Sequence, residues 1–345
     1  MKMRRKGSGA LSWSKLVVAG QALALLFAAC PQDFAAGKQS SLKLLREREG
    51  LALKAKAEIL PLSDDSQLLL ARIVDAGERG DWQRIQQMFS AYHQSEIQIH
   101  TAVMHAAIMC GQYSRGAKVY ESLCALNVTK TAPAYTQALK IYAHLGLRDV
   151  VDRVWAEAQA CCELDQPLAA ARIDAAASVG DVQTAAFVLD RMNRSGVSVN
   201  IAHVTSAIRA CWETEGHGHN AARFLYQLLL DLGLKPNVVT FTCLIGAYKT
   251  APLEDILAAI ADMQAMDIAA NTAFVETFLI TVLRKPRDGR WSVADIIAMV
   301  PTWPSGRVAA AKSALEDFKR EHIQLSQLSR KIDLALQQVD TGDDV

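Results

Sequence analysis

A period of about 35 residues runs through most of the sequence and constrains its fold more than any other feature. Four glycines that each separate two apolar helical segments follow one another at intervals of 31, 35 and 34 residues: Gly80, Gly111, Gly146 and Gly180. Three asparagines continue the series at intervals of 37 and 34 residues: Asn200, Asn237 and Asn271. One helix pair of this length cannot bury its own apolar face, so successive pairs must stack. The period therefore predicts a helical solenoid.

The segment 237–248, NVVTFTCLIGAY, shows why helices are predicted in place of strands. Its β-branched start, 238–240, favours a short strand. Its apolar residues, however, fall on one helical face at i, i+3, i+4 and i+7: Phe241, Leu244, Ile245 and Tyr248. The upstream proline blocks a continuing helix, and Asn237 is able to cap a new one. Only 6% of the residues are aromatic, and period-2 alternation is rare, so we expect very little sheet.

Residues 238–271, VVTFTCLIGAYKTAPLEDILAAIADMQAMDIAAN, resemble one unit of the pentatricopeptide repeat family. The resemblance lies in a V-T-Y-N-like start, a Leu-Ile pair, a Lys before the turn, acidic residues opening the second helix, a late Met and a closing Asn. Residues 181–200, DVQTAAFVLDRMNRSGVSVN, resemble the second half of the same unit. The Trp, Leu-Gly and Tyr pattern of the tetratricopeptide repeat finds no good match. The resemblance implies an all-α, right-handed superhelix of helix-turn-helix repeats without a catalytic C-terminal domain.

The register of these repeats divides the chain into a presequence, an array and a cap. The presequence is 1–60, and the array spans 66–304. The repeats are placed at 66–96, 97–131, 132–165, 166–200, 201–237 and 238–271, with a degenerate seventh at 272–304 that Pro286, Pro301 and Pro304 interrupt. Residues 305–345 are predicted to form one amphipathic capping helix, centred on 313–338, and a disordered tail from residue 340. The same helix is a candidate surface for a partner protein.

The family resemblance implies sequence-selective binding of single-stranded RNA, one base per repeat, with a role in RNA processing, stability or translation. In the family, a residue one turn into the first helix and the last residue of the unit read a base edge together. By register, the candidate pairs are Thr101 with Thr131, Thr136 with Asp165, Ala170 with Asn200, Thr205 with Asn237, and Thr242 with Asn271. The family code reads Thr with Asn as adenine and Thr with Asp as guanine, which gives N-G-N-A-A. A Thr at this position is also often only a cap or a surface residue.

Positive charge for phosphate contacts is predicted at Lys140, Arg209 and Lys249 on the first helices of their repeats. The whole array is not basic. Residues 1–60 hold eleven of the 37 Lys and Arg and four of the 36 acids, which leaves 26 basic and 32 acidic residues for the remainder. A strongly basic stripe is usual in nucleic-acid binders. The alternative is therefore a scaffold that holds a peptide or an extended protein segment without RNA.

The first 60 residues resemble a targeting presequence. Residues 16–30, LVVAGQALALLFAAC, are uncharged and too short for a typical membrane span, which favours a signal-like segment. A Lys- and Arg-rich stretch with leucines at helical spacing follows and is similar to a transit peptide. This order resembles the bipartite presequence of plastids, so we expect a plastid or a mitochondrion. The alternative is a secreted or membrane-anchored solenoid.

The sequence predicts no enzyme, no cofactor and no small-molecule substrate. Seven cysteines include no CxxC pair, and most are expected on apolar helix faces as buried, reduced thiols. The segment 211–220, CWETEGHGHN, holds Glu213, His217 and His219, but two histidines two residues apart in a loop make a poor metal site. We interpret this segment as a lengthened turn between two helices. No phosphate-binding glycine loop or nucleophile motif is recognised.

Overall fold

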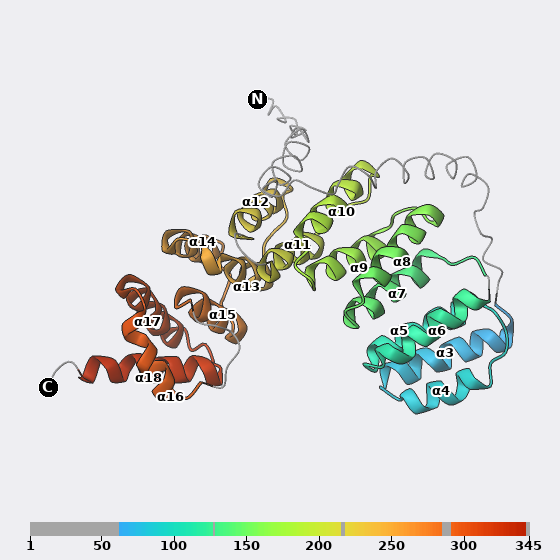
Figure 1. Cartoon of the computed structure of the whole chain (residues 1–345), viewed down its shortest axis with the longest axis horizontal. Coiled ribbons are helices and arrows are strands. Elements are labelled where there is room, and N and C mark those ends of the chain that lie inside the picture. Colours follow the sequence, from blue (N-terminus) through green and yellow to red (C-terminus); the bar gives the residue numbers. More distant parts are fainter. Residues whose placement is uncertain (1–61, 127, 215–217, 285–290, 343–345) are drawn as a thin grey trace, which may run out of the picture. The chain divides into compact units, whose positions relative to one another are not determined.

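The computed structural model describes residues 62–126, 128–214, 218–284 and 291–342, and every regular element in these ranges is helical (Figure 1). The predicted fold class, an all-α repeat of stacked helix pairs of the α–α superhelix class, is confirmed. The helix predicted at the segment 237–248 is also confirmed, because α13 spans Val238–Ala247. The presequence, 1–60, lies outside the described residues. None of the described helices combines the length and the apolar character that a membrane span requires.

The described chain divides into two compact units, each with its own core. The first unit comprises the described residues up to Ala176 together with Gln183–Val199, and the second comprises Ala177–Val182 and the described residues from Asn200 onward. The helices of the first unit are α3 (Asp64–Glu78), α4 (Trp82–Ser90), α5 (Ile97–Met109), α6 (Tyr113–Ala125), α7 (Ala132–His144), α8 (Arg148–Cys161), α9 (Gln166–Ala177) and α10 (Val182–Arg194). The odd-numbered helices are first helices of the repeats, and α3, α5 and α7 pack in that order.

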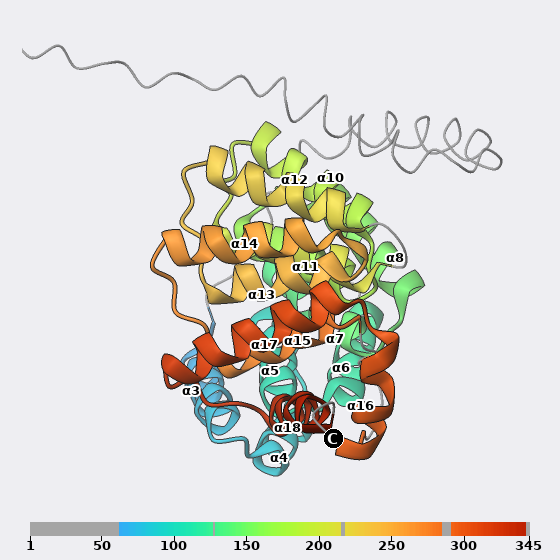
Figure 2. The same ribbon diagram turned by 90° about the vertical axis from the view of Figure 1, so that its left-hand side faces the viewer.

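The second unit continues the same arrangement and then departs from it. Its helices are α11 (Ile201–Glu213), α12 (Gly218–Asp231), α13 (Val238–Ala247), α14 (Leu253–Ala265), α15 (Thr272–Val282), α16 (Val293–Met299), α17 (Ser305–Arg320) and α18 (Gln327–Gly342), with short 3₁₀ turns at Tyr248–Thr250 and Val300–Thr302. The first helices α11, α13 and α15 pack side by side, and Figure 2 shows them together with α12 and α14. Buried Phe241, Phe274 and Phe278 lie in the core of this unit.

The first helices begin where a short polar side chain is available to cap them. Asn200 accepts a hydrogen bond from the backbone N–H of His203 at 3.2 Å, and Asn237 accepts one from Thr240 at 3.0 Å. Asn271 does the same for Phe274 at 2.9 Å. An N-cap of this kind satisfies one of the backbone donors that a helix start leaves unpaired. The last residue of each of these repeats therefore starts the next helix.

The four periodic glycines end the first helix of their repeats in the left-handed region, with φ between 67° and 72°. Gly180 carries a second constraint. A Cβ atom there would lie 2.9 Å from the backbone of Glu213 and Thr214, and the Thr214 hydroxyl donates a hydrogen bond to the Gly180 carbonyl at 2.8 Å. No side chain fits in that space, so the close approach of two backbones requires glycine.

The C-terminal region corrects the prediction of a single capping helix. The helix α17 ends at Arg320, and His322 has a φ of 58°. The backbone N–H of Ile323 donates to the Phe318 carbonyl at 2.9 Å, which is the pattern of a left-handed helix end. The second helix, α18, begins at Gln327. The prediction was wrong because both helices have an apolar face, and the 3.6-residue spacing continues across the break by chance.

The degenerate seventh repeat is not an ordinary helix pair. The short helix α16, which would be the second helix of this repeat, packs against α18. The helix α17 packs against α15 in its place. Arg307 of α17 is buried there and donates hydrogen bonds to the carbonyls of Val282 and Ala251 at 3.0 and 2.8 Å. The helix α18 extends to Gly342, so the first residues of the predicted disordered tail, 340–342, are helical. Residues 343–345 lie outside the described residues.

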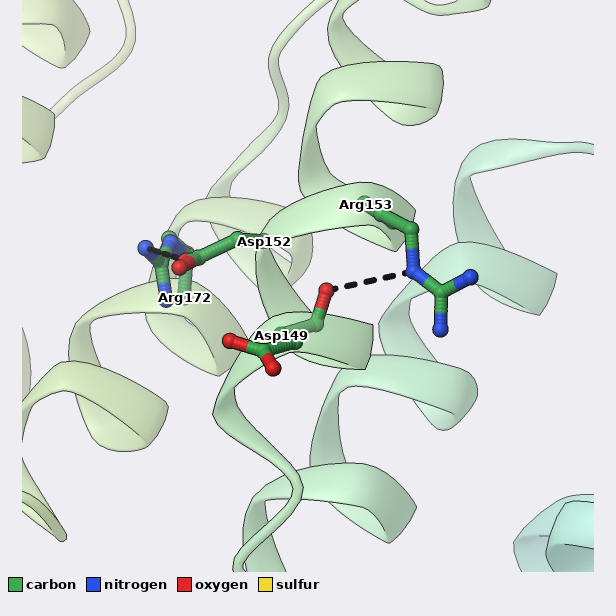
Figure 3. A network of polar contacts seen from close by, with 4 residues as sticks. All are labelled: Asp149, Asp152, Arg153 and Arg172. Atoms are coloured by element: carbon green, nitrogen blue, oxygen red, sulfur yellow. Dashed lines mark hydrogen bonds and ion pairs between the residues drawn. The ribbon is translucent and has the colours of Figure 1, made fainter.

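A buried arginine links α8 and α9 in the first unit (Figure 3). The guanidinium of Arg172 is 2.6 Å from the carboxylate of Asp152, and the Arg172 side chain is only 8% exposed. The same guanidinium lies 6.0 Å from the ring centre of Trp155, within the range of a cation–π contact. The pair therefore joins two consecutive repeats.

We expect the substitution Asp152→Ala to lower the free energy of unfolding by about 1 kcal/mol, because it removes an ionic partner from a mostly buried guanidinium. The value is at the low end because the Asp152 side chain is 65% exposed. The matched control is Asp149→Ala on the same helix, since Arg153 contacts only the backbone carbonyl of Asp149, at 3.4 Å. Urea denaturation followed by circular dichroism measures both. Equal effects of the two variants would contradict the role assigned to the ion pair.

Candidate nucleic-acid interface

Equivalent positions on the first helices form one face, which we call the candidate face. In the second unit it consists of Ala202, Thr205, Arg209 and Trp212 from α11, and Val239, Thr242, Gly246 and Lys249 from α13 and the 3₁₀ turn that follows it. These residues recur three or four positions apart, so they lie along one side of each helix. The helices α11 and α13 pack directly against each other. The two rows of side chains are therefore neighbours.

Three of the four threonines at the first-helix positions use their hydroxyl protons within their own helices. Thr101, Thr136 and Thr242 each donate to the carbonyl four residues earlier, at 2.8, 2.8 and 2.7 Å. Only the oxygen lone pairs remain for a ligand, so each such hydroxyl acts as an acceptor. Thr205 shares a hydrogen bond of 3.0 Å with Thr240 of the next first helix. Any ligand group that binds the hydroxyl of Thr101, Thr136 or Thr242 must therefore supply a hydrogen-bond donor.

The threonines differ in how much of their surface a ligand can reach. Thr101, Thr205 and Thr242 are partly exposed, as is Ala170. Thr136 is only 3% exposed, because it lies in the packing around α7. The sequence pattern treats these positions as equivalent, but the structure places the Thr136 hydroxyl below the surface. The pair Thr136 and Asp165 is therefore presented less openly than the others.

The closing residues of the repeats have a structural role that the sequence analysis assigned only to Asn237. Asn200, Asn237 and Asn271 are exposed N-caps that use the side-chain oxygen, which leaves the amide nitrogen to donate. Asp165 accepts from the backbone of Leu168 at 2.8 Å, and Thr131 precedes α7 without a cap bond from its side chain. Asn200, Asn237 and Asn271 thus each cap a first helix with the side-chain oxygen and keep an amide donor at the same helix start.

One candidate pair is joined by hydrogen bonds. The Thr205 hydroxyl contacts the Thr240 hydroxyl, and the Thr240 hydroxyl lies 3.2 Å from the Asn237 side-chain oxygen. Thr240 is fully buried, so this connection is shielded from water. Thr242 and Asn271 belong to the adjacent helices α13 and α15. Both pairs of the second unit are therefore carried by packed first helices.

The candidate cations are distributed between the two units. Lys140 is partly exposed on α7 of the first unit, whereas Arg209 and Lys249 are exposed in the second. Burial raises the pKa of the Cys243 thiol to about 11, and the positive charge of Arg209 acts in the opposite direction. Two cations of the candidate face thus belong to one pair of neighbouring helices.

Sequence reasoning missed Trp212. The available signal was Gly246, which occupies the position where the first helices α7 and α11 carry Lys140 and Arg209. A Cβ atom on Gly246 would lie 2.3 to 2.7 Å from three ring atoms of Trp212. The indole therefore occupies the space that a side chain at residue 246 would need.

The exposure of the cysteines differs from the prediction, and the segment 211–220 can be placed on its helices. Of the six described cysteines, all free thiols, only Cys211 and Cys243 are buried, while Cys124 and Cys161 are exposed. The prediction that most are buried was wrong, because Cys124 and Cys161 lie on the solvent side of second helices. Residues 211–213 of the segment 211–220 end α11 and residues 218–220 begin α12, so the connection predicted there is shorter than the segment. His219 contacts the Thr250 hydroxyl at 3.2 Å. His217 lies outside the described residues.

Comparison with known proteins adds a family and several similar structures. Residues 187–251 match the family model of the pentatricopeptide repeat domain. No curated protein sequence matches the chain. Among solved structures, the chain is similar to the pentatricopeptide repeat protein PPR10 from maize, with 16% identity, a TM-score of 0.45, and coverage of 94% of this chain and 49% of that one. A structure of PPR10 in complex with an 18-nt psaJ RNA element gives 17% identity, a TM-score of 0.44, and coverage of 92% and 50%.

The chain spans about half the length of these structures. The family match begins within the second helix α10 and includes the complete repeat 201–237 and the start of the next one. The predicted resemblance to the pentatricopeptide repeat family is thus confirmed over residues 187–251.

Proposed function

We propose that this protein binds single-stranded RNA with sequence selectivity in an organelle and acts there in RNA processing, stability or translation. The observation that carries the proposal is the pairing, on packed first helices, of a threonine acceptor with an asparagine donor: Thr205 with Asn237, and Thr242 with Asn271. The family to which residues 187–251 belong binds RNA through such positions. The presequence expected from residues 1–60 supports a plastid or a mitochondrion as the location.

The hydrogen-bond chemistry of the pairs accounts for the predicted base preference. The Watson–Crick edge of adenine offers one N–H donor at N6 and one acceptor at N1, which match a threonine acceptor and an asparagine amide donor. The edge of guanine offers two neighbouring donors, which match a threonine and an aspartate that both accept. The pairs of the second unit therefore support adenine at two consecutive positions. Ala170 has no polar group, so its repeat contributes little selectivity.

The first test is binding of the full chain to a pool of random single-stranded RNA over a range of salt concentrations. We expect enrichment of sequences with consecutive adenines and an affinity that falls steeply with salt. The variant Lys249→Gln should reduce the slope of log affinity against log salt by about 0.7, the value of one phosphate contact on a single strand. The control is Lys118→Gln on the second helix α6, which should leave the slope unchanged. Absence of binding at low salt would contradict the proposal.

A second candidate function is a protein-interaction scaffold, which one groove of the second unit favours. The groove has a volume of about 880 Å³ and lies between the end of α14, the start of α15 and the end of α17. Its lining combines Phe274, Phe318 and Ile323 with Asp267 and Glu321. Apolar floors with acidic rims suit a basic amphipathic peptide. A chain that fails to bind RNA would therefore be tested next against such peptides.

A further inference from the structure

The side chain of Trp212 lies flat on the helix beside it. A Cβ atom built on Gly246 would be 2.3 Å from Cδ2, 2.4 Å from Cε2 and 2.7 Å from Cε3 of the indole. Cδ2 and Cε2 form the bond that fuses the two rings, so ring atoms surround them within the plane. An atom this close to both can lie only above the ring face. One face of the indole therefore covers Gly246, and the opposite face is directed away from α13.

This arrangement accounts for the burial of Gly246. The other members of its row on α13, Val239, Thr242 and Lys249, are exposed or partly exposed, whereas Gly246 is buried. The nearest atoms over Gly246 all belong to Trp212. Trp212 itself remains partly exposed. An aromatic surface thus replaces a side chain at the centre of the candidate face.

Two cations lie one helical turn from the two residues that form this contact. Arg209 precedes Trp212 by one turn on α11, and Lys249 follows Gly246 by one turn. Both cations are exposed. Sites that bind single-stranded nucleic acid combine cations for the phosphates with aromatic rings on which bases stack, because every base has a flat π face. Arg209, Trp212 and Lys249 bring these two elements together; we call them the stacking platform.

We infer that the outer face of Trp212 stacks on one base of the bound RNA, while Arg209 and Lys249 contact the phosphates on either side. This inference rests on the proposed function and adds a contact that does not depend on base identity. Trp212 lies seven residues after Thr205 on α11, or about 10 Å along the helix. The stacked base is therefore a separate contact from the base edge read at Thr205. The platform increases affinity at the repeat 201–237 without changing which base is preferred there.

The test compares Trp212→Leu and Trp212→Phe with the unchanged chain in RNA binding, using the A-rich sequence that the pool selects. Loss of one base stack should weaken the binding of Trp212→Leu about tenfold, while Trp212→Phe keeps a stacking ring and should remain within about threefold. The salt slope should not change in either variant, because the indole has no charge. The matched control is Phe187→Leu, which removes an aromatic side chain that is 56% exposed on the second helix α10.

Abasic RNA provides the decisive comparison. The selected RNA is prepared with one base removed at each position in turn. At one position, base removal should weaken the unchanged chain about tenfold and have no further effect on Trp212→Leu, because both changes remove the same contact. Thermal unfolding of each variant shows whether the leucine chain keeps its fold, and Trp212→Phe keeps the test informative if it does not.

The outcomes separate the inference from the proposed function. If the unchanged chain binds RNA with steep salt dependence and Trp212→Leu binds equally well, the RNA proposal stands and the stacking platform is rejected. Equal weakening by base removal at every position in both proteins also rejects it, since the indole then serves only to pack α11 against α13. If the unchanged chain binds no RNA at low salt, both the proposed function and the inference are wrong.

Discussion

Replacement of Gly180 by alanine is expected to lower the free energy of unfolding by about 3 kcal/mol. Two costs add at this position. A side chain in the left-handed region costs about 1 kcal/mol, and a Cβ atom 2.9 Å from the backbone of Glu213 and Thr214 forces two segments apart. The separation also weakens the 2.8 Å hydrogen bond from the Thr214 hydroxyl to the Gly180 carbonyl. Urea denaturation of the full chain measures the change.

The control for Gly180→Ala is Gly146→Ala. Gly146 has nearly the same φ, 70° against 69°, but a Cβ atom added there would meet no other atom within 4 Å. The control should therefore cost only about 1 kcal/mol, the conformational penalty alone. A difference of less than about 1 kcal/mol between the two variants would show that the backbone approach at Gly180 contributes little.

The substitution Asn271→Asp is expected to change the base preferred by the pair with Thr242 from adenine to guanine. The aspartate accepts hydrogen bonds and no longer donates, so the pair then presents two acceptors to the two donors of the guanine edge. The ratio of affinities for guanine and adenine at that position should rise at least about fivefold, since one good pair of hydrogen bonds is worth about 1–3 kcal/mol. Binding to two RNAs that differ only at that position measures the ratio.

The control for this switch is Asn237→Asp, which should move the same preference to the neighbouring RNA position. Both substitutions should leave stability nearly unchanged, because aspartate caps helices as well as asparagine does. A loss of affinity for both RNAs without a change in their ratio would assign Asn271 to the cap alone. If both variants changed the base preference at the same RNA position, the assignment of each pair to its own RNA position would be wrong.

Much of the architecture could be predicted from the sequence because the repeat register and the helix starts depend on local features. The glycines, the capping asparagines and the apolar spacing act within a few residues, so they identified the helix at 238–247 correctly. The break between α17 and α18 could not be predicted, because two apolar faces in phase look like one. The helix α17 ends because His322 adopts a left-handed conformation. Glycine is the usual residue at such a helix end, so a histidine there does not predict one.

The candidate site was less predictable, because it depends on which helix covers which residue. Thr136 and Thr242 occupy the same position in their repeats, yet only the surroundings of Thr136 bury it. Trp212 was overlooked for a similar reason, since the position of its ring depends on the absence of a side chain at Gly246 of the next repeat. Local pattern identifies a position within a repeat, whereas packing between repeats decides whether that position meets solvent.

Under the proposed function, the capping role of the closing residues limits which bases the repeats can distinguish. A residue at the end of a repeat must start the next helix, and the side chains that do this well are Asn, Asp, Ser and Thr. Those are also short groups with few hydrogen-bonding states, so each state corresponds to one kind of base edge. Exchanges within this set would change the preferred base at almost no cost in stability. Substitution by a longer or apolar residue would remove both the base preference and the helix cap, and would therefore also destabilise the fold.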